Sequence, residues 1–375
     1  MKVLILSCTA GEGHNSAAKA IKEVYDQSGE YCEIQNALEF ISKTLSNFVA
    51  KSHIILYRHF PSWFNFGYTY CENNPSILAP GSLVYKIFSK GTESLYKYIS
   101  DNGFDTVICT HSFAAVIVTE IVNHYNLKIQ TGFVATDFTC HPGTKDSDLD
   151  FYFIPDEKLA DDFTCDHIQK EEVLPFGIPI RQRFYEHIDK TTAKTEFGIP
   201  SDRKHVVMMC GSMGCGPLAK LALEFANTMP ECEFSVICGN NAKLKKSLDR
   251  KSRNIRNLHI FGFMNDMPKV LDSADLYLTK PGGISTSEAV AKEVPMLFVN
   301  TVAACESYNL KHFLSYGVAD SGKNVKELTE KCVDIIQNEE KLEAFKQNLK
   351  NMPKVNSSEQ IRQTMLNAKN KERDA

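Results

Sequence analysis

No stretch of this 375-residue sequence approaches the 18 consecutive apolar residues of a membrane-spanning helix. One lysine precedes a short apolar run at the N-terminus, and that run is too short for a secretory signal peptide. The net charge of −4 gives no overall attraction to nucleic acid. We therefore expect a cytoplasmic protein that has no nucleic-acid partner and meets the cell membrane only at its cytoplasmic surface.

Motifs for metal and hydrolase chemistry are also missing. The twelve cysteines form no Cys-x-x-Cys pair, so they indicate reduced thiols rather than a zinc or redox site. Neither His-Glu-x-x-His nor Gly-x-Ser-x-Gly occurs, which argues against zinc and serine hydrolases. The segment "DSDLD" at 146–150 begins like a calcium loop, but Phe151 stands where that loop requires glycine. We expect neither a metal nor a cofactor.

A glycine-rich turn, "SCTAGEGHNSAA" at 7–18, follows the strand-like run "KVLIL". The turn lacks the third glycine of a dinucleotide-binding fingerprint, because Ser16 stands in its place, and Asn36 stands where an acidic ribose ligand is needed. His14 lies where the turn meets the following helix. Main-chain N–H groups gather at such a point, and an imidazole there can face a ligand.

Apolar runs rich in β-branched residues alternate with helical patterns along the chain, which predicts parallel sheets covered by crossover helices. The pattern restarts at "HVVMMC" after a polar segment at about 186–203. We predict an α/β protein with two Rossmann-like, doubly wound domains, 1–185 and 186–352, facing a cleft. A helix at 353–375 is expected to return to the first domain.

Residues 41–100 interrupt this alternation. They contain twelve aromatic residues and six Lys or Arg against two Glu, in a chain that is negative overall. One interpretation is a helical insertion that packs its aromatic side chains against the first domain. The other is an interfacial patch for anionic lipid, in which Trp63, Phe64 and Phe66 contact the membrane. Both interpretations can hold for different residues.

Three polar side chains follow predicted strands of the first domain: His14, His111 and Asp137. Because parallel strands end at the same edge of a sheet, we expect these side chains to lie close together. A histidine beside a carboxylate can act as a general base. The alternative for each residue is helix capping or a hydrogen-bonded place in the core.

The second domain opens with "MMCGSMGCGPLAKLALEF", which predicts a strand, a glycine-rich turn and a helix. Main-chain N–H groups of Gly211, Ser212 and Gly214 would form an anion site suited to phosphate. The turn lacks the Gly-Lys-Ser/Thr of a P-loop, so the sequence does not predict nucleotide triphosphate hydrolysis.

A second phosphate-type turn occurs in "TKPGGISTSEAVAKE". Gly282 and Gly283 allow close approach of the backbone, and Ser285 and Thr286 begin a helix. Glu288 lies in the first turn of that helix, where it either interacts with the helix dipole or accepts hydrogen bonds from a ribose diol. Two such turns with a carboxylate indicate a nucleotide diphosphate.

The ordered set of motifs "AGEGHNSAA", "ICTHSF", "VATDF", "PFGIPIRQRF", "CGSMG", "GFMNDMPKVLDSADLYLTKPGGISTSEA" and "ESYN" resembles the diacylglycerol glycosyltransferase and monogalactosyldiacylglycerol synthase family. More distantly, the chain resembles the peptidoglycan lipid-intermediate N-acetylglucosaminyltransferase. The resemblance covers residues 1 to about 320. It implies a GT-B fold and a hexosyltransferase of EC 2.4.1 type, with inverting, metal-independent transfer. The implied donor is a UDP-sugar bound by the second domain, and the implied acceptor is a membrane lipid entering through the first.

The resemblance also assigns roles to residues. Gly13 and His14 would approach the donor and acceptor, with His14 as the base. The residues implied to bind the nucleotide are Phe263 and Met264 at the uracil, Ser285 and Thr286 at the phosphates, and Glu288 at the ribose. Ile284 is also expected to bind the donor. Cys305, Glu306 and Asn309 would hold the sugar hydroxyls. Cys305 replaces the family's usual glutamine, so a sugar other than glucose or galactose is an open alternative.

Two other functions remain open from the sequence. A UDP-sugar epimerase of the same fold would act on a soluble substrate and would not need the aromatic, basic insertion. A nucleotide-sugar-binding regulator without transfer activity is favoured only by Cys305 in the expected sugar site.

Overall fold

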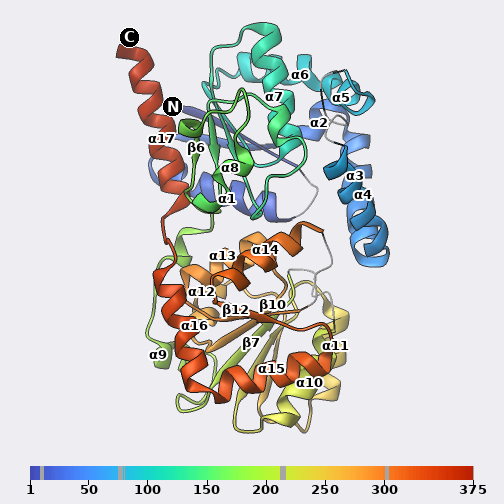
Figure 1. Ribbon diagram of the computed structural model, residues 1–375, viewed down its shortest axis with the longest axis vertical. Helices are drawn as coiled ribbons and strands as arrows, with labels where there is room; N and C mark the ends of the chain where they lie inside the picture. The colour runs from blue at the N-terminus through green and yellow to red at the C-terminus, as the bar shows by residue number, and fades with distance from the viewer. Residues whose placement is uncertain (9–11, 75–78, 80, 212–216, 300–303, 375) are drawn as a thin grey trace. The chain divides into compact units, whose positions relative to one another are not determined.

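The computed structural model describes residues 1–8, 12–74, 79, 81–211, 217–299 and 304–374. The chain forms two compact units. Unit 1 comprises Met1–Gln182, Val302–Tyr308 and Val355–Ala375, and unit 2 comprises Arg183–Thr301 and Asn309–Lys354. Each unit contains a six-stranded sheet in which all strands are parallel (Figure 1). The predicted α/β class with two Rossmann-like domains is confirmed.

The sheet of unit 1 has the strand order β2-β1-β3-β4-β5-β6. Its strands are β1 (Lys2–Ser7), β2 (Tyr31–Asn36), β3 (Thr106–Cys109), β4 (Gln130–Val134), β5 (Phe151–Phe153) and β6 (Val173–Leu174). The helices are α1 (Glu12–Gln27), α2 (Ala37–Ile41), α3 (Lys43–His59), α4 (Pro61–Asn73), α5 (Leu83–Phe88), α6 (Thr92–Asp101), α7 (Ser112–Tyr125), α8 (Ala160–Phe163) and α17 (Ser357–Asp374).

Strand β1 is buried on both faces because its side chains alternate between two cores. Leu4 and Leu6 belong to the core that includes residues of α6 and α7, whereas Val3 and Ile5 belong to the core that includes residues of α1. Met365 of α17 also belongs to this second core. Helix α17 therefore covers the same face of the sheet as α1, beside which it lies (Figure 1).

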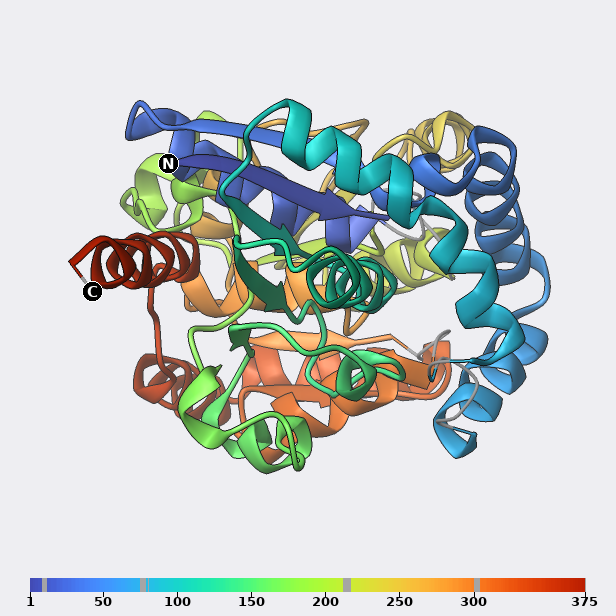
Figure 2. The same cartoon turned by 90° about the horizontal axis from the view of Figure 1, so that it is seen from above.

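The aromatic insertion forms helices α2 to α6, and its aromatic residues divide into two groups. Tyr96 and Tyr98 of α6 pack against the core of unit 1. Trp63 and Phe66 of α4 are exposed, with 69% and 66% of their surface accessible. In both ribbon views α3 and α4 lie on the side of unit 1 opposite to α17 (Figure 2).

The sheet of unit 2 has the strand order β12-β11-β10-β7-β8-β9. Its strands are β7 (His205–Met209), β8 (Glu233–Ile237), β9 (Leu258–Phe261), β10 (Leu276–Thr279), β11 (Met296–Phe298) and β12 (Ala319–Ser321). The helices are α9 (Lys190–Glu196), α10 (Leu218–Thr228), α11 (Ala242–Lys251), α12 (Met267–Asp272), α13 (Gly283–Ala291), α15 (Val325–Gln337) and α16 (Glu339–Asn351). Helix α14 (Ala304–Ser315) begins in the segment assigned to unit 1 and ends in unit 2.

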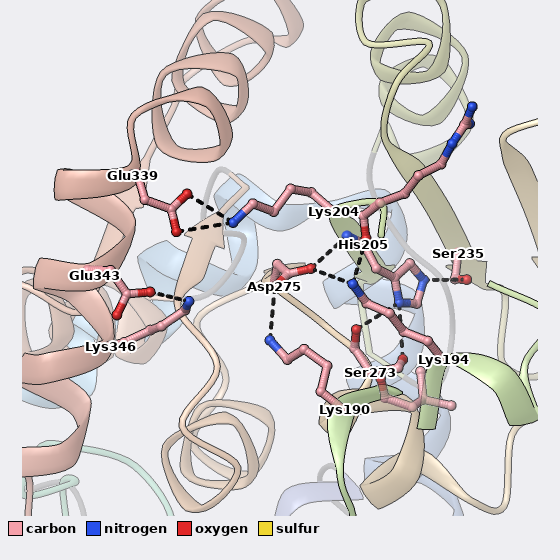
Figure 3. Close-up of polar contacts among 12 residues, drawn as sticks. Lys190, Lys194, Lys204, His205, Ser235, Ser273, Asp275, Glu339, Glu343 and Lys346 are labelled. Carbon is pink, nitrogen blue, oxygen red and sulfur yellow. Dashed lines mark hydrogen bonds and ion pairs between the residues drawn. The ribbon is translucent and has the colours of Figure 1, made fainter. Parts of the chain in front are cut away.

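A buried histidine begins strand β7. Ser273 donates its hydroxyl proton to the carbonyl of Val270, so its oxygen accepts from Nδ1 of His205 over 3.0 Å. Nε2 of His205 then accepts from the hydroxyl of Ser235 over 2.8 Å (Figure 3). Burial lowers the pKa of His205 to about 4, so its imidazole is neutral at neutral pH.

Asp275 lies beside this histidine at the start of β10. Its carboxylate accepts from the main-chain N–H of His205 over 2.9 Å and from Nζ of Lys190 over 2.9 Å (Figure 3). Nζ of Lys194 is 3.3 Å away. These contacts join α9 to the amino ends of β7 and β10.

Candidate functional site

The carboxyl edge of the sheet in unit 1 brings together two of the predicted histidines. Strands β1 and β3 run in register, with Leu6 opposite Cys109, so the residues that follow them share one edge. The rings of His14 and His111 lie there with their centroids 4.5 Å apart. The first turn of α1 is held to β1 by a hydrogen bond of 2.7 Å between Ser7 and Asn15, next to His14.

The tautomer of His14 follows from its partners. Its Nδ1 lies 2.6 Å from the carbonyl oxygen of Thr110 and 3.0 Å from the hydroxyl oxygen of Thr136. A carbonyl oxygen can only accept, so Nδ1 carries the proton and the basic lone pair is at Nε2. This arrangement orients an imidazole that can accept a proton.

His111 caps helix α7. Its Nδ1 accepts from the main-chain N–H of Phe113 over 3.1 Å, and its ring lies 4.6 Å from that of Phe113. Because Nδ1 is the acceptor in this bond, the neutral ring carries its proton on Nε2. His111 therefore caps the helix, as one of the two interpretations of the sequence expected. A catalytic role for His111 stays a prediction.

Asp137 pairs with a histidine that was not expected from the sequence. Nε2 of His141 lies 3.1 Å from Oδ2 of Asp137, and Nδ1 of the same ring lies 2.8 Å from the hydroxyl of Tyr68 in α4. The side chains of Asp137 and His141 are only 18% and 17% exposed. Asp137 follows Thr136 in the chain, and the hydroxyl of Thr136 lies 3.0 Å from Nδ1 of His14.

The exposed aromatic face of α4 is formed by Trp63, Phe66 and Tyr70. The ring centroids of Trp63 and Phe66 are 6.4 Å apart, and those of Phe66 and Tyr70 are 6.3 Å apart. This spacing of three and four residues places them on one side of the helix. Phe64, predicted to contact the membrane with Trp63 and Phe66, is only half exposed.

In unit 2, a lysine lies across two glycine turns at the carboxyl ends of neighbouring strands. Gly211 follows β7 and Lys280 follows β10, and these strands pair with Met209 opposite Thr279. A β-carbon on Gly211, which has φ +69°, would be 3.1 Å from Cε of Lys280, and one on Gly282 would be 3.7 Å from Nζ. Ser212 and Gly214, the other members of the first turn, lie outside the described residues.

Helix α13 begins directly after this lysine, with Gly282 as its N-cap. The hydroxyl of Thr286 donates to the carbonyls of Gly282 and Gly283, over 2.9 Å and 3.0 Å, so its proton is used within the helix. The first turn, which contains Ile284, has a glycine instead of a capping side chain, and its main-chain N–H groups face the end of the helix.

Two polar residues of α13 lie near the buried Tyr277. Burial raises the pKa of Tyr277, and the charge of Glu288 raises it further. The nearby Ser285 acts to lower the pKa of the Tyr277 hydroxyl. Glu288 is half-buried and lies beyond the first turn of α13, contrary to the prediction, because the helix begins at Gly283. Its role at a ribose remains a prediction.

The residues expected at the uracil and the sugar occupy two other elements. Phe263 is exposed two residues after the end of β9, next to the half-buried Met264. Helix α14 carries the half-buried Cys305 and the buried Glu306 and Asn309. The amide of Asn309 donates to the carbonyl of Pro281 over 2.9 Å, which fixes its side chain to the turn before α13.

Sequence reasoning missed Lys280, His141 and Tyr68. A usable signal existed for Lys280, because a cation that follows a strand and precedes two glycines stands at an anion-binding turn. Helix α1 begins at Glu12, so Gly13 and His14 lie in its first turn rather than in the turn expected before the helix.

The described part of the chain contains neither a candidate metal cluster nor a candidate membrane-spanning helix. Within the ranges given above, no group of three or more His, Cys, Asp or Glu side chains is placed to hold a metal ion. In the same part of the chain, every helix is too short or too polar to cross a membrane.

Two family models match the chain, one in each half. Residues 14–180 match monogalactosyldiacylglycerol (MGDG) synthase, and residues 205–369 match the glycosyltransferase family 28 C-terminal domain. A processive diacylglycerol beta-glucosyltransferase of Bacillus pumilus (strain SAFR-032) is 28% identical, covering 96% of this chain and 93% of that protein. The Staphylococcus saprophyticus protein of the same name is 24% identical, with 84% and 80% covered. The family resemblance expected from the motifs is confirmed.

Solved structures share the fold at low sequence identity. Acinetobacter baumannii MurG has a TM-score of 0.66 at 13% identity, covering 97% of this chain and 99% of that one. A Neisseria meningitidis UDP-GlcNAc 2-epimerase bound to UDP-GlcNAc has a TM-score of 0.62 at 16% identity, with 98% and 100% covered. These likenesses confirm the expected GT-B architecture.

Proposed function

Because residues 14–180 match MGDG synthase and residues 205–369 match the glycosyltransferase family 28 C-terminal domain, we propose that the protein transfers a hexose from a UDP-sugar to a diacylglycerol-type lipid. Its curated relatives are named as processive diacylglycerol beta-glucosyltransferases, so UDP-glucose is the first donor to test. We place the reaction at a membrane surface, with inversion at the sugar carbon and without a metal ion.

The observation that carries the proposal is the imidazole of His14, whose Nδ1 proton is held by the carbonyl of Thr110 over 2.6 Å. This bond leaves Nε2 as the proton acceptor. The lipid hydroxyl attacks C1 of the sugar, its proton passes to Nε2, and the bond between C1 and the diphosphate oxygen breaks. A positioned general base of this kind accelerates a reaction by about 10²- to 10⁴-fold.

The leaving UDP gains negative charge on its diphosphate, and unit 2 carries groups that stabilise such a charge. The methylene groups of Lys280 pass beside Gly211, and its ammonium lies close to Gly282, the N-cap of α13. A cation and oriented N–H groups need no rearrangement as the charge develops. The protein itself thus supplies the positive charge that a metal ion provides in other transferases.

The lipid acceptor requires access to a membrane surface. Trp63, Phe66 and Tyr70 offer an aromatic face suited to the headgroup boundary. Exposed lysines of the same insertion, Lys43 and Lys51 among them, supply attraction to anionic lipid.

An assay of UDP release tests this function. The protein is incubated with UDP-glucose, UDP-galactose or UDP-N-acetylglucosamine, with vesicles that contain or lack dioleoylglycerol, and both UDP and glycolipid are measured. Release that requires dioleoylglycerol and yields glycolipid supports transfer. Conversion of the nucleotide sugar without release would indicate an epimerase, and donor binding without any turnover would indicate a regulator.

A further inference from the structure

A chain of hydrogen bonds joins α4 to the carboxyl edge of the sheet in unit 1. The hydroxyl of Tyr68 lies 2.8 Å from Nδ1 of His141, and Nε2 of the same ring lies 3.1 Å from Oδ2 of Asp137. The rings of Tyr68 and His141 meet edge to face, with centroids 5.7 Å apart. We call this chain the Tyr68–His141–Asp137 relay.

The proton positions in the relay follow from the chemistry of its ends. The carboxylate of Asp137 can only accept, so Nε2 of His141 carries a proton and donates it. In the neutral imidazole, Nδ1 then accepts a hydrogen bond from the hydroxyl of Tyr68. Burial, together with the nearby charges of Glu72 and Asp137, raises the pKa of Tyr68, which keeps its hydroxyl protonated as a donor.

Tyr68 and the exposed aromatic residues lie on different sides of α4. At about 100° per residue, Tyr68 is rotated by about 140–200° around the helix from Trp63, Phe66 and Tyr70. Tyr68 itself is half-buried, whereas those three side chains are 50% to 69% exposed. The helix thus presents one side to solvent and anchors its opposite side through the relay.

The far end of the relay lies at the same edge of the sheet as the proposed base. Asp137 follows Thr136 in the chain, and the hydroxyl of Thr136 lies 3.0 Å from Nδ1 of His14. Because strand β4 ends at Val134, both residues stand at the carboxyl edge of the sheet. A shift of the Asp137 carboxylate would therefore alter the surroundings of the reacting hydroxyl.

We propose that Tyr68 and His141 are positioning residues that hold the Asp137 carboxylate for the acceptor hydroxyl and tie it to the membrane-facing helix α4. This inference rests on the proposed function. The carboxylate accepts a hydrogen bond from the lipid hydroxyl and orients it toward the sugar while His14 removes the proton. Tyr68 and His141 act only through Asp137, because in this proposal Asp137 is the member of the relay that contacts the lipid hydroxyl.

Kinetics of single and double variants test the proposal. Tyr68→Phe removes one hydroxyl, and it is expected to lower kcat for glucosyl transfer about 10-fold, the loss that accompanies one broken hydrogen bond near a charged group. The KM for UDP-glucose should stay within about twofold of the parent, because donor binding is separate from the relay. In an Asp137→Asn background, Tyr68→Phe should add less than about a twofold loss.

Substitutions of His141 provide the matched comparison. His141→Gln keeps an N–H group near the position of Nε2, whereas His141→Leu removes both ring nitrogens. We expect His141→Gln to recover most of the turnover that His141→Leu loses. Equal turnover of the two variants, or the same loss from Tyr68→Phe in both backgrounds, would overturn the relay. Weaker vesicle binding by Tyr68→Phe without any loss of kcat would also overturn it, because that result would assign Tyr68 to supporting α4 alone.

A spectroscopic readout separates this proposal from the proposed function. With ¹⁵N-labelled histidine, the imidazole signals assigned through His141→Gln should show a proton on Nε2 and none on Nδ1 at neutral pH. Tyr68→Phe and Asp137→Asn should each change those signals. If the parent forms no glycolipid with any donor but the signals behave in this way, the transfer function fails and the relay stands. Unchanged signals in both variants would overturn the relay.

Discussion

The imidazole of His14 donates its Nδ1 proton to the main-chain carbonyl of Thr110 over 2.6 Å. This bond fixes the ring in the tautomer that a general base requires. We expect His14→Ala to lower the turnover of lipid-dependent transfer by about 10²- to 10⁴-fold. The affinity for UDP should not change, because the residues proposed to bind the uracil, diphosphate and ribose lie in unit 2, and calorimetry with UDP checks this.

The pH dependence of turnover separates His14 from its neighbours. A base that must be neutral to act produces the acidic limb of the profile, so His14→Ala should flatten that limb. His111→Asn serves as the control, because asparagine can cap α7 in place of the imidazole. If His14→Ala keeps near-parental turnover and Asp137→Ala loses it, the carboxylate is the base.

The lysine across the two glycine turns leads to a second prediction. Lys280→Met removes the ammonium beside Gly282, the N-cap of α13, and it should weaken UDP binding about 10-fold or more by removing a hydrogen bond to a charged group. Uridine has no phosphate, so its affinity should stay the same. Calorimetric titration with both compounds measures the difference.

Two further variants test the geometry at this lysine. Gly211→Ala places a methyl group about 3.1 Å from the lysine side chain at a residue with φ +69°, so it should weaken UDP binding as well. Lys243→Met, which removes an exposed lysine of α11, is the control and should bind UDP like the parent. Equal loss of UDP and uridine binding in Lys280→Met would argue against a diphosphate contact.

The exposed face of α4 leads to a third prediction. Replacing Trp63, Phe66 and Tyr70 together by serine should lower partitioning into anionic vesicles more than about tenfold, because their apolar surface no longer enters the headgroup region. Binding of the parent should weaken as salt rises, since part of the attraction is electrostatic. Co-sedimentation with vesicles of stated anionic lipid content measures both effects.

A matched control for the membrane face is Tyr31→Ser. Tyr31 is 54% exposed, yet it lies on β2 rather than in the insertion. Its loss should leave vesicle partitioning unchanged. If the triple variant binds vesicles as well as the parent does, another surface must contact the lipid.

The buried His205 leads to a prediction about stability. Its pKa is lowered to about 4 from an ordinary value of 6.5, so the unfolded chain binds the proton first as the pH falls. Folding stability is therefore lost between about pH 6.5 and about pH 4, and the loss amounts to about 2 kcal/mol between pH 7 and pH 5. Denaturant unfolding at the two pH values measures it.

To isolate this histidine, the change in unfolding free energy between pH 7 and pH 5 is compared between the parent and His205→Gln. His205→Gln removes the titrating group, so its stability should change less between pH 7 and pH 5 than that of the parent. The absolute stability of the variant does not enter, because each protein is compared with itself. The same pH dependence in both proteins would exclude His205 as the source.

The strand pattern of the sequence sufficed to predict the sheets and the edge at which His14 and His111 meet. Parallel strands are buried on both faces, so each strand appears in the sequence as a continuous run of apolar, often β-branched, residues. The capping bond of His111 also follows from a rule about what precedes a helix. Lys280 could have been found by the same rule of strand ends.

Other features depend on contacts that no local pattern contains. Tyr68 and His141 are 73 residues apart and lie on separate elements, so their bond requires the tertiary structure. In "PSWFNFGYTY" every aromatic residue looks alike, and only the phase of α4 separates the exposed Trp63 from the anchored Tyr68. The hydroxyl of Thr286, expected at the phosphates, donates instead to carbonyls within its own helix.

Helix α17 completes the core of unit 1 with Ile361 and Met365, although about half of the chain, including all of unit 2, lies between it and the sixth strand of that sheet. During synthesis the ribosome therefore releases the last part of this core after the whole of unit 2 has emerged. Until then, the apolar side chains of α1 and β4 that α17 covers are exposed, and they are a surface for chaperones or for aggregation. Truncation of α17 would therefore lower the yield of folded protein by impairing the folding of unit 1, whose strands lie far from α17 in the sequence.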